Sequence, residues 1–281
     1  MKKIFQILLT LFCLLLGSQA FAQIELRLQP VRKDFIVGEN VALRLTIINQ
    51  TDASISLRNT PGRPWLNFSM TKRGESGPVS PIATARFPEL VLTPGSTRSF
   101  EFNLKSIYRL STAGNYAAVA TIRIPDGQST YSSNRGLFTL TNGGKVREFN
   151  IQARGQRIVM SLRLAMVNGK QCLFGQAINK DTNQVIGACY LAEYLNFMQP
   201  SVLLDSAQNL HVLCQSSPKF YTYSVMNTHG NRSSAKLYQR IGGQPVDLIS
   251  TGKGIMTTGL SPYVAPKPGT EKIRKASERP F

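Results

Sequence analysis

Few side chains in this sequence could carry out metal or nucleophilic chemistry, because the chain has only two histidines. His211 and Cys214 lie three residues apart in an apolar segment that predicts a β-strand. Side chains alternate between the two faces of a strand, so these two should point in opposite directions. They are therefore poorly placed to act as base and nucleophile or to share a metal ion. His229 lies in an Asn-Thr-His-Gly-Asn turn, where a solvated histidine is ordinary.

Other motifs that would indicate catalysis do not occur. The sequence has no Gly-x-Ser-x-Gly elbow and no phosphate-binding loop, and Gly252-x-Gly254 misses the dinucleotide-binding spacing. The 15 acidic residues are scattered over predicted strands and turns and nominate no carboxylate pair. We therefore expect no catalytic, cofactor-binding or metal site, and a protein that is not an enzyme. A hydrolase of unrecognised type on envelope polymers, using an acid pair or Cys214, is the alternative.

Three cysteines follow the N-terminal leader: Cys172, Cys189 and Cys214. If Lys180-Asp181 forms a two-residue hairpin turn, Cys172 falls opposite Cys189, and the pair could form a disulfide in an oxidising compartment. Three cysteines leave at least one unpaired. The alternative is that all three are small apolar residues packed in strands.

The first 22 residues predict a secretory signal peptide. A basic start precedes an apolar run over 4–16 and small residues up to Ala22, where we expect cleavage. This pattern resembles a bacterial exported precursor and implies a periplasmic or extracellular protein. The apolar run is too short to remain in a bilayer, and no later stretch is long enough, so we expect no transmembrane segment after signal removal.

The chain is strongly basic, with a formal net charge of +18 from 33 basic and 15 acidic residues. Basic residues are spread evenly on both sides of residue 145 and form no run. A nucleic-acid-binding protein usually concentrates such charge on one face. We therefore expect no specific nucleic-acid site, although a field this positive would attract anionic envelope polymers or lipid head groups.

Alternating apolar positions predict a β-sandwich over residues 23–145. Val41, Leu43, Leu45 and Ile47 form one such row, and the even positions from Ala118 to Ile124 form another. The segment 60–94 is rich in Pro and Gly and predicts a long loop after one strand. In it, Trp65 and Phe68 are either core residues or, with Arg63, part of a contact surface.

A resemblance to a known superfamily rests on three features of this region. They are Phe-x-Val-Gly-Glu-x-Val at 35–41, Asn-x-Thr at 49–51, and the Gly114-x-Tyr116 entry into a late strand. Together they resemble bacterial immunoglobulin-like modules, in which such a tyrosine forms a tyrosine corner. The resemblance implies a module that binds, spaces or supports other domains, with Trp65 as the candidate core tryptophan.

Residues 146–262 predict a second, smaller antiparallel β domain. Asn168-Gly169 between two apolar runs is a strong hairpin signal. Residues 191–197 could be strand or short helix. The pattern over 204–238 is similar to one β-propeller blade, but the region is too short for a complete propeller. Residues 263–281 predict a disordered basic tail.

These observations predict an exported, non-catalytic, all-β binding or structural protein that acts on a protein partner or an anionic cell-envelope component. A proteinase inhibitor, presenting loops of the first module to a protease cleft, is a further alternative to the hydrolase. The sequence names neither the partner nor the surface that contacts it.

Overall fold

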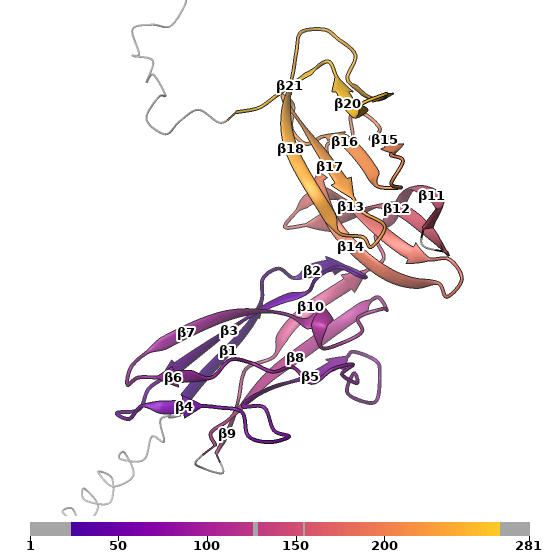
Figure 1. Ribbon diagram of the computed structural model, residues 1–281. Helices are drawn as coiled ribbons and strands as arrows, with labels where there is room; N and C mark the ends of the chain where they lie inside the picture. The colour runs from indigo at the N-terminus through magenta and orange to yellow at the C-terminus, as the bar shows by residue number, and fades with distance from the viewer. Residues whose placement is uncertain (1–23, 126–128, 154, 265–281) are drawn as a thin grey trace, which may run out of the picture. The chain divides into compact units, whose positions relative to one another are not determined.

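The computed structural model describes residues 24–125, 129–153 and 155–264. The predicted signal peptide and all but the first two residues of the predicted tail lie outside these ranges. The described residues form strands and turns with one 3₁₀ turn, Leu104–Ser106, and no α-helix. The protein is therefore all-β, with several separate sheets, as the alternating pattern predicts (Figure 1).

Contacts between residues divide the chain into two compact units, and neither is one continuous segment. Of the described residues, the first unit contains 24–33, 41–109, 115–125 and 129–138. The second contains 34–40, 110–114, 139–153 and 155–264. Two short segments of the first half are thus built into the second unit.

The first unit is organised around two sheets. One is antiparallel with the order β1-β3-β7, formed by Ile24–Pro30, Ala42–Asn49 and Thr97–Asn103. The other has the order β2-β10-β8-β5 with β9 on β8, formed by Asp34–Ile36, Gly136–Thr141, Gly114–Arg123, Leu66–Lys72 and Thr130–Ser132. In this sheet β2 runs parallel to β10, and β2 and the end of β10 belong to the second unit. A separate short pair consists of β4 (Ile55–Leu57) and β6 (Leu90–Leu92).

The core of the first unit lies between its two sheets. The predicted row on β3 and before it is fully buried: Val41, Leu43, Leu45 and Ile47. The facing row on β8 is equally buried: Ala118, Ala120 and Ile122. Both rows confirm the period-two prediction, and each large aliphatic side chain contributes about 1.5–3 kcal/mol on burial. Phe68 on β5 meets Phe102 on β7 with ring centroids 5.4 Å apart, which joins the two sheets.

Two buried tyrosines, Tyr108 and Tyr116, make contacts within this core. The Tyr108 hydroxyl donates a buried hydrogen bond of 2.5 Å to the backbone carbonyl of Phe68. Tyr116, the residue that the superfamily resemblance points to, stacks its ring on Phe138 at a centroid distance of 5.4 Å.

The second unit is a pair of packed sheets with an added hairpin. One sheet has the order β11-β12-β13-β14, formed by Gly144–Ala153, Gln156–Val167, Lys170–Asn179 and Gln184–Glu193. The other has the order β15-β16-β17-β18-β21, formed by Ser201–Leu204, Leu210–Gln215, Phe220–Met226, Arg232–Arg240 and Leu260–Pro262. The hairpin pairs β19 (Asp247–Thr251) with β20 (Gly254–Thr258).

Two of the apolar clusters in this unit lie on opposite faces of its second sheet. The larger lies between the sheets and takes Met160, Leu162 and Leu173 from one sheet and Val212 and Met226 from the other. The smaller lies on the other face of the second sheet and consists of Leu213, Tyr221, Leu248 and Leu260. Because Leu248 belongs to β19, this cluster fixes the hairpin against the sheet.

One predicted turn of this unit is confirmed and another is wrong. Asn168 and Gly169 adopt positive φ angles of 51° and 76° between paired Val167 and Lys170, as expected for a tight hairpin. The Lys180-Asp181 turn has four loop residues instead of two, because Asn179 pairs with Gln184. The Asn179 side chain accepts hydrogen bonds from the backbone N–H groups of Asp181 and Thr182, which stabilises the longer loop.

Three glycines meet at one point of the second unit. Ile36 to Glu39 form a turn in which the Glu39 N–H donates to the Ile36 carbonyl and Gly38 has φ +89°. The Gly38 carbonyl accepts a hydrogen bond of 2.9 Å from the Ala188 N–H, which places Gly38 against Gly187. A Cβ atom on Gly230 would lie 2.3 Å from the Gly187 carbonyl oxygen, so Gly230 also presses on Gly187.

Candidate functional site

The three cysteines are structural. Cys172, Cys189 and Cys214 form no disulfide with one another, and none is exposed. Cys172 lies opposite Glu193 and Cys189 opposite Gly175, so the register that would place these two cysteines opposite each other does not form. The alternative, in which the cysteines pack as small apolar residues, holds instead. The longer loop and two register shifts along β13 and β14 move the strands out of the expected alignment. Burial raises the pKa of both Cys189 and Cys214 to about 12, which keeps them protonated near neutral pH.

His211 and Cys214 point to opposite faces of β16, as predicted. Cys214 belongs to the core between the two sheets. His211 lies on the other face, where its Nδ1 atom shares a hydrogen bond with the Tyr223 hydroxyl. Its Nε2 atom is 3.0 Å from Oδ2 of Asp205. The Cys214 thiol and the His211 imidazole therefore lie on opposite sides of the sheet, and the imidazole contacts Asp205 and Tyr223 instead.

That chain, Asp205–His211–Tyr223, has the carboxylate–imidazole–hydroxyl order found in some catalytic sites. Burial raises the pKa of the Tyr223 hydroxyl, and nearby Tyr238 and Asp205 raise it further, so the phenolate is disfavoured. Burial also opposes ionisation of Asp205, but hydrogen bonds from His211 and Asn209 outweigh it and hold the pKa of that carboxyl below its usual value. These pKa shifts suit a neutral tyrosine whose hydroxyl donates a hydrogen bond to the imidazole. The contacts from Asp205 through His211 to Tyr223 also connect the turn before β16 to β17.

No group of three or more His, Cys, Asp or Glu side chains gathers as metal ligands in the described part of the chain. His229 lies in the turn between β17 and β18, where its N–H donates to Oδ1 of Asn227. Gly252 and Gly254 lie in and beside the turn of the β19–β20 hairpin.

Trp65 and Phe68 are buried core residues. Of the two predictions for them, core residues or a contact surface, the first is confirmed. The Trp65 Nε1–H donates 3.0 Å to the carbonyl of Pro88, and the Phe87 ring packs edge-on against both Trp65 and Phe68. Part of the Pro-rich segment is thus anchored to the core by aromatic contacts. Arg63 is exposed and does not join this cluster.

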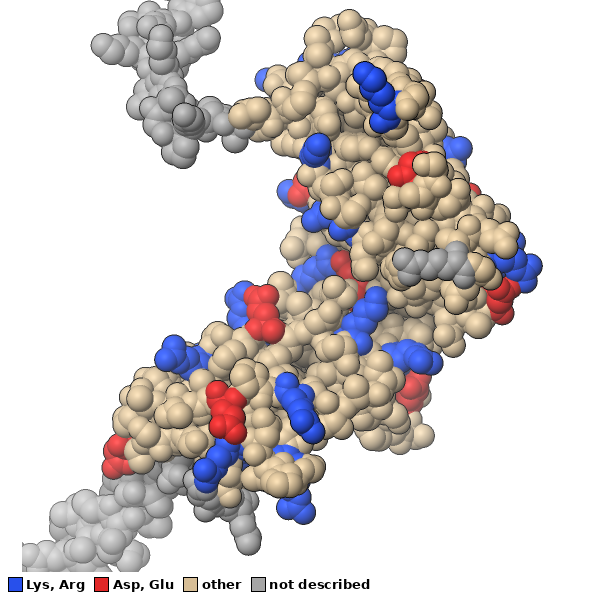
Figure 2. Space-filling view, viewed as in Figure 1, with Lys and Arg blue, Asp and Glu red and all other residues tan. Residues whose placement is uncertain are grey.

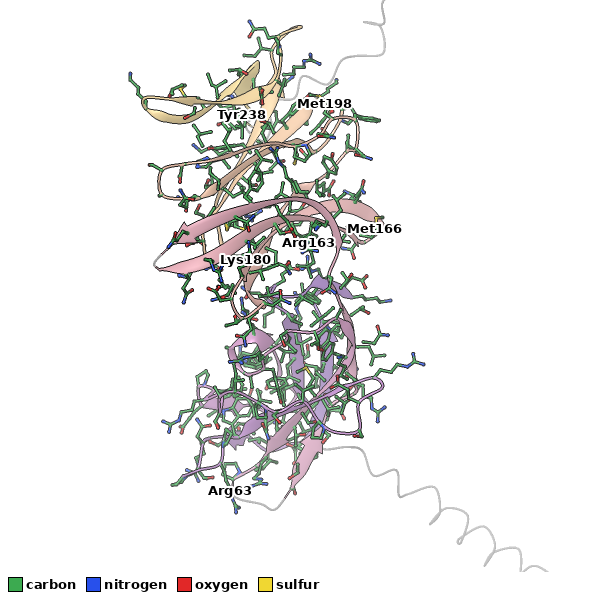
Figure 3. The ribbon with its side chains drawn as sticks, turned by 90° about the vertical axis from the view of Figure 1, so that its right-hand side faces the viewer. Arg63, Arg163, Met166, Lys180, Met198 and Tyr238 are labelled. Carbon is green, nitrogen blue, oxygen red and sulfur yellow. The ribbon has the colours of Figure 1, made fainter. Side chains whose placement is uncertain are left out.

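Exposed apolar side chains border the smaller cluster of the second unit. Ile249 and Met256 are directly paired across the hairpin and are 42% and 54% exposed. Phe197 is 77% exposed, and the neighbouring Met198 accepts a weak hydrogen bond from the Tyr221 hydroxyl through its sulfur. Met198 contacts Tyr221, and Ile249 follows Leu248 in the chain. Tyr221 and Leu248 both belong to the smaller cluster, so Met198 and Ile249 each lie beside it. We call Phe197, Met198, Ile249 and Met256 the hairpin surface, of which Figure 3 labels Met198.

Sequence reasoning missed the hairpin surface because it assigned no strands to 241–262. The available signal was the Gly-Lys-Gly segment at 252–254 between two short runs containing Leu248-Ile249 and Ile255-Met256. Such a spacing is typical of a hairpin.

Charged side chains are dispersed on the face drawn in Figure 2. Lysine and arginine side chains lie over both units on this face, with acidic side chains among them. Several form exposed ion pairs, such as Arg44 with Glu101 at 2.6 Å and Lys170 with Glu193 at 2.7 Å. Exposed pairs of this kind add little to stability.

Comparison with known proteins adds little to this description. No family model and no curated protein matches the chain. Among solved structures, the crystal structure of the E. coli chaperone DraB matches with 12% identity over 75% of this chain and 96% of that chain, at a TM-score of 0.26. A similarity this weak carries no argument about fold or function. Within the described residues, no helix has the length and apolar character to cross a membrane.

Proposed function

We propose that this protein is an exported, non-catalytic binding protein with an immunoglobulin-like first unit, and that it binds an acidic exported protein. The strand arrangement supports the immunoglobulin-like assignment. Sheet β1-β3-β7 corresponds to the A, B and E strands of that fold, and β5, β8 and β10 correspond to C, F and G.

The placement of reactive side chains favours binding over catalysis. None of the thiols is exposed, the Cys189 and Cys214 thiols have raised pKa values, and the single imidazole of the second sheet is bound on both nitrogens. The hydrolase alternative that used Cys214 would need this buried thiol to reach a substrate.

The hairpin surface is the observation that carries the proposal. Ile249 and Met256 are exposed side by side across the hairpin, and adjoining exposed apolar side chains commonly mark contact sites for other proteins. Burying Ile249 and Met256 completely would contribute about 1–3 kcal/mol at roughly 25 cal/mol per Å². The net charge of +18 favours a partner of opposite charge, which would be attracted over a distance before the apolar contact forms.

The experiment compares capture of exported proteins by the mature chain and by two variants. Immobilised protein is exposed to the exported fraction of the source cells and washed at about 0.5 M salt, where exposed-charge attraction is screened. The test variant is Ile249→Ser with Met256→Ser. The matched control is Met166→Ser, because Met166 is a methionine of similar exposure, 56%, elsewhere in the same unit.

A retained protein is then purified, its net charge is determined, and its dissociation constant is measured with all three chains. We expect an acidic partner whose affinity falls about tenfold or more with the double variant and stays unchanged with Met166→Ser. Elution of every protein by the salt wash would contradict the proposal. Equal binding by the double variant would assign the contact to another surface.

A further inference from the structure

A second candidate site, unrelated to the hairpin surface, is a pocket of about 300 Å³ in the second unit. All of its lining residues belong to that unit, and they come from β12, β13, the start of β14 and the segments near 37, 111 and 142. The volume is at the lower end of the range typical of small-molecule sites.

Arg163 lines the pocket, and its side chain is 16% exposed. Its Nε atom is the one buried side-chain nitrogen or oxygen without a hydrogen-bond partner among the described residues. A buried donor without an acceptor is costly, and the cost is greater when the group is charged. A water molecule or a bound ligand can supply the acceptor that such a group lacks.

The acidic neighbour of Arg163 does not complete them. Glu148 approaches the Arg163 Nη2 atom at 3.5 Å, the outer limit of a hydrogen bond. The same carboxylate also contacts Lys145 at 3.4 Å and the Ser161 hydroxyl at 3.5 Å. The Glu148 carboxylate is therefore shared by two cations, Lys145 and Arg163, through long contacts. These three side chains together carry a net positive charge.

The rest of the lining defines what would fit. Ser111, Asn142 and Asn183 are exposed and bring a hydroxyl and two amide groups that can donate hydrogen bonds. Val37, Ile178 and Val185 supply an aliphatic wall.

The floor is fixed by Gln176, which is buried and whose Nε2–H donates 2.9 Å to the backbone carbonyl of Val37. Arg163 is held on β12 between paired Lys145 and Phe174. The guanidinium is therefore presented by a sheet rather than by a mobile loop, an arrangement that suits a preorganised site.

We propose that this pocket binds a carboxylate on a short aliphatic stem. A planar guanidinium offers paired N–H groups whose geometry matches the two oxygens of a carboxylate. The aliphatic wall would contact the stem, and the rim amides would donate to the same oxygens. Phosphate is also an anion, but it has no apolar part and would leave the aliphatic wall of the pocket without a contact.

The test is a titration of ¹⁵N-labelled mature protein with butyrate, followed by NMR through the Arg163 Nε–H signal and the side-chain amide signals of Asn142 and Asn183. The wild-type titration needs no variant and is therefore independent of folding effects. Inorganic phosphate and chloride are titrated separately. The variants are Arg163→Lys, Glu148→Gln and the matched control Arg157→Lys. Arg157 lies on the same strand and forms an exposed ion pair with Asp181.

We expect butyrate to shift these signals with a dissociation constant on the order of millimolar, well below that of phosphate. Arg163→Lys should weaken binding about tenfold or more because lysine lacks the paired donors, and Arg157→Lys should leave it unchanged. Glu148→Gln should strengthen binding, because it removes a competing carboxylate. Absence of shifts, equal affinity for phosphate, or unchanged binding by a folded Arg163→Lys variant would overturn the proposal.

Discussion

Replacing Gly230 by alanine tests how closely the backbone packs in the second unit. Gly230 has φ +75°, a left-handed conformation that costs an alanine about 1–2 kcal/mol. The added Cβ atom would also lie 2.3 Å from the oxygen and 2.4 Å from the carbon of the Gly187 carbonyl. Both neighbours are backbone atoms of β14, so they cannot rotate away as a side chain could.

Gly169 provides a matched control. Its φ of +76° is nearly the same, but a Cβ atom there would have no neighbour within 4 Å. Gly169→Ala should therefore cost only the backbone strain, about 1–2 kcal/mol. Gly230→Ala adds an overlap that must shift β14 or the turn, and overpacking of this kind costs about 1–3 kcal/mol more. We expect a total loss of about 2–5 kcal/mol for Gly230→Ala.

Urea denaturation followed by far-UV circular dichroism measures both free energies of unfolding. Tryptophan fluorescence is unsuitable because the only tryptophan, Trp65, lies in the first unit. The difference between the two variants isolates the contact with Gly187, since the backbone strain is common to both. Equal losses for the two variants would refute the inferred close approach of Gly230 to Gly187.

Two further predictions concern titratable groups. Because hydrogen bonds hold the folded-state pKa of Asp205 below 3.8, its ionised form contributes stability above that pH and loses it as the pH falls through the folded-state value. Asp205→Asn should thus weaken the dependence of unfolding free energy on pH in the acid range, and an unchanged urea–pH profile would argue against the Asp205–His211 contact. The burial of Cys172 and the raised pKa values of Cys189 and Cys214 predict that the thiols react with a disulfide reagent near pH 8 only after unfolding. Rapid reaction of folded protein, or fewer than three reactive thiols after denaturation without reductant, would contradict the buried, free state of the cysteines.

Local patterns predicted the elements of the fold well where burial alternates along one strand. The rows from Val41 to Ile47 and from Ala118 to Ile122 are read directly from the sequence, because one face of each strand is core. Asn168-Gly169 was equally direct, since its positive φ angles suit those two residue types. The register that would face Cys172 with Cys189 does not form, because the longer loop after Asn179 and two shifts in register depend on side-chain contacts that no periodicity encodes.

The candidate sites were harder to predict than the strands. Ile249 and Met256 look like ordinary strand residues in the sequence, and only the packing of Leu248 on the second sheet leaves them outside. Arg163 likewise gives no signal of its own among the basic residues of the chain. Its burial comes from the surrounding sheet and from the segment near Val37, which is 126 positions earlier in the sequence.

The sequence by itself therefore determined that the chain forms β-strands with turns at defined positions, because strand alternation and turn conformation depend on residues close together in the chain. Tertiary structure decided which segments form each unit, how Gly38 and Gly230 meet Gly187, and which polar atom is buried without an acceptor. These features depend on contacts between distant segments, whose alignment is set by packing and loop length rather than by local preference.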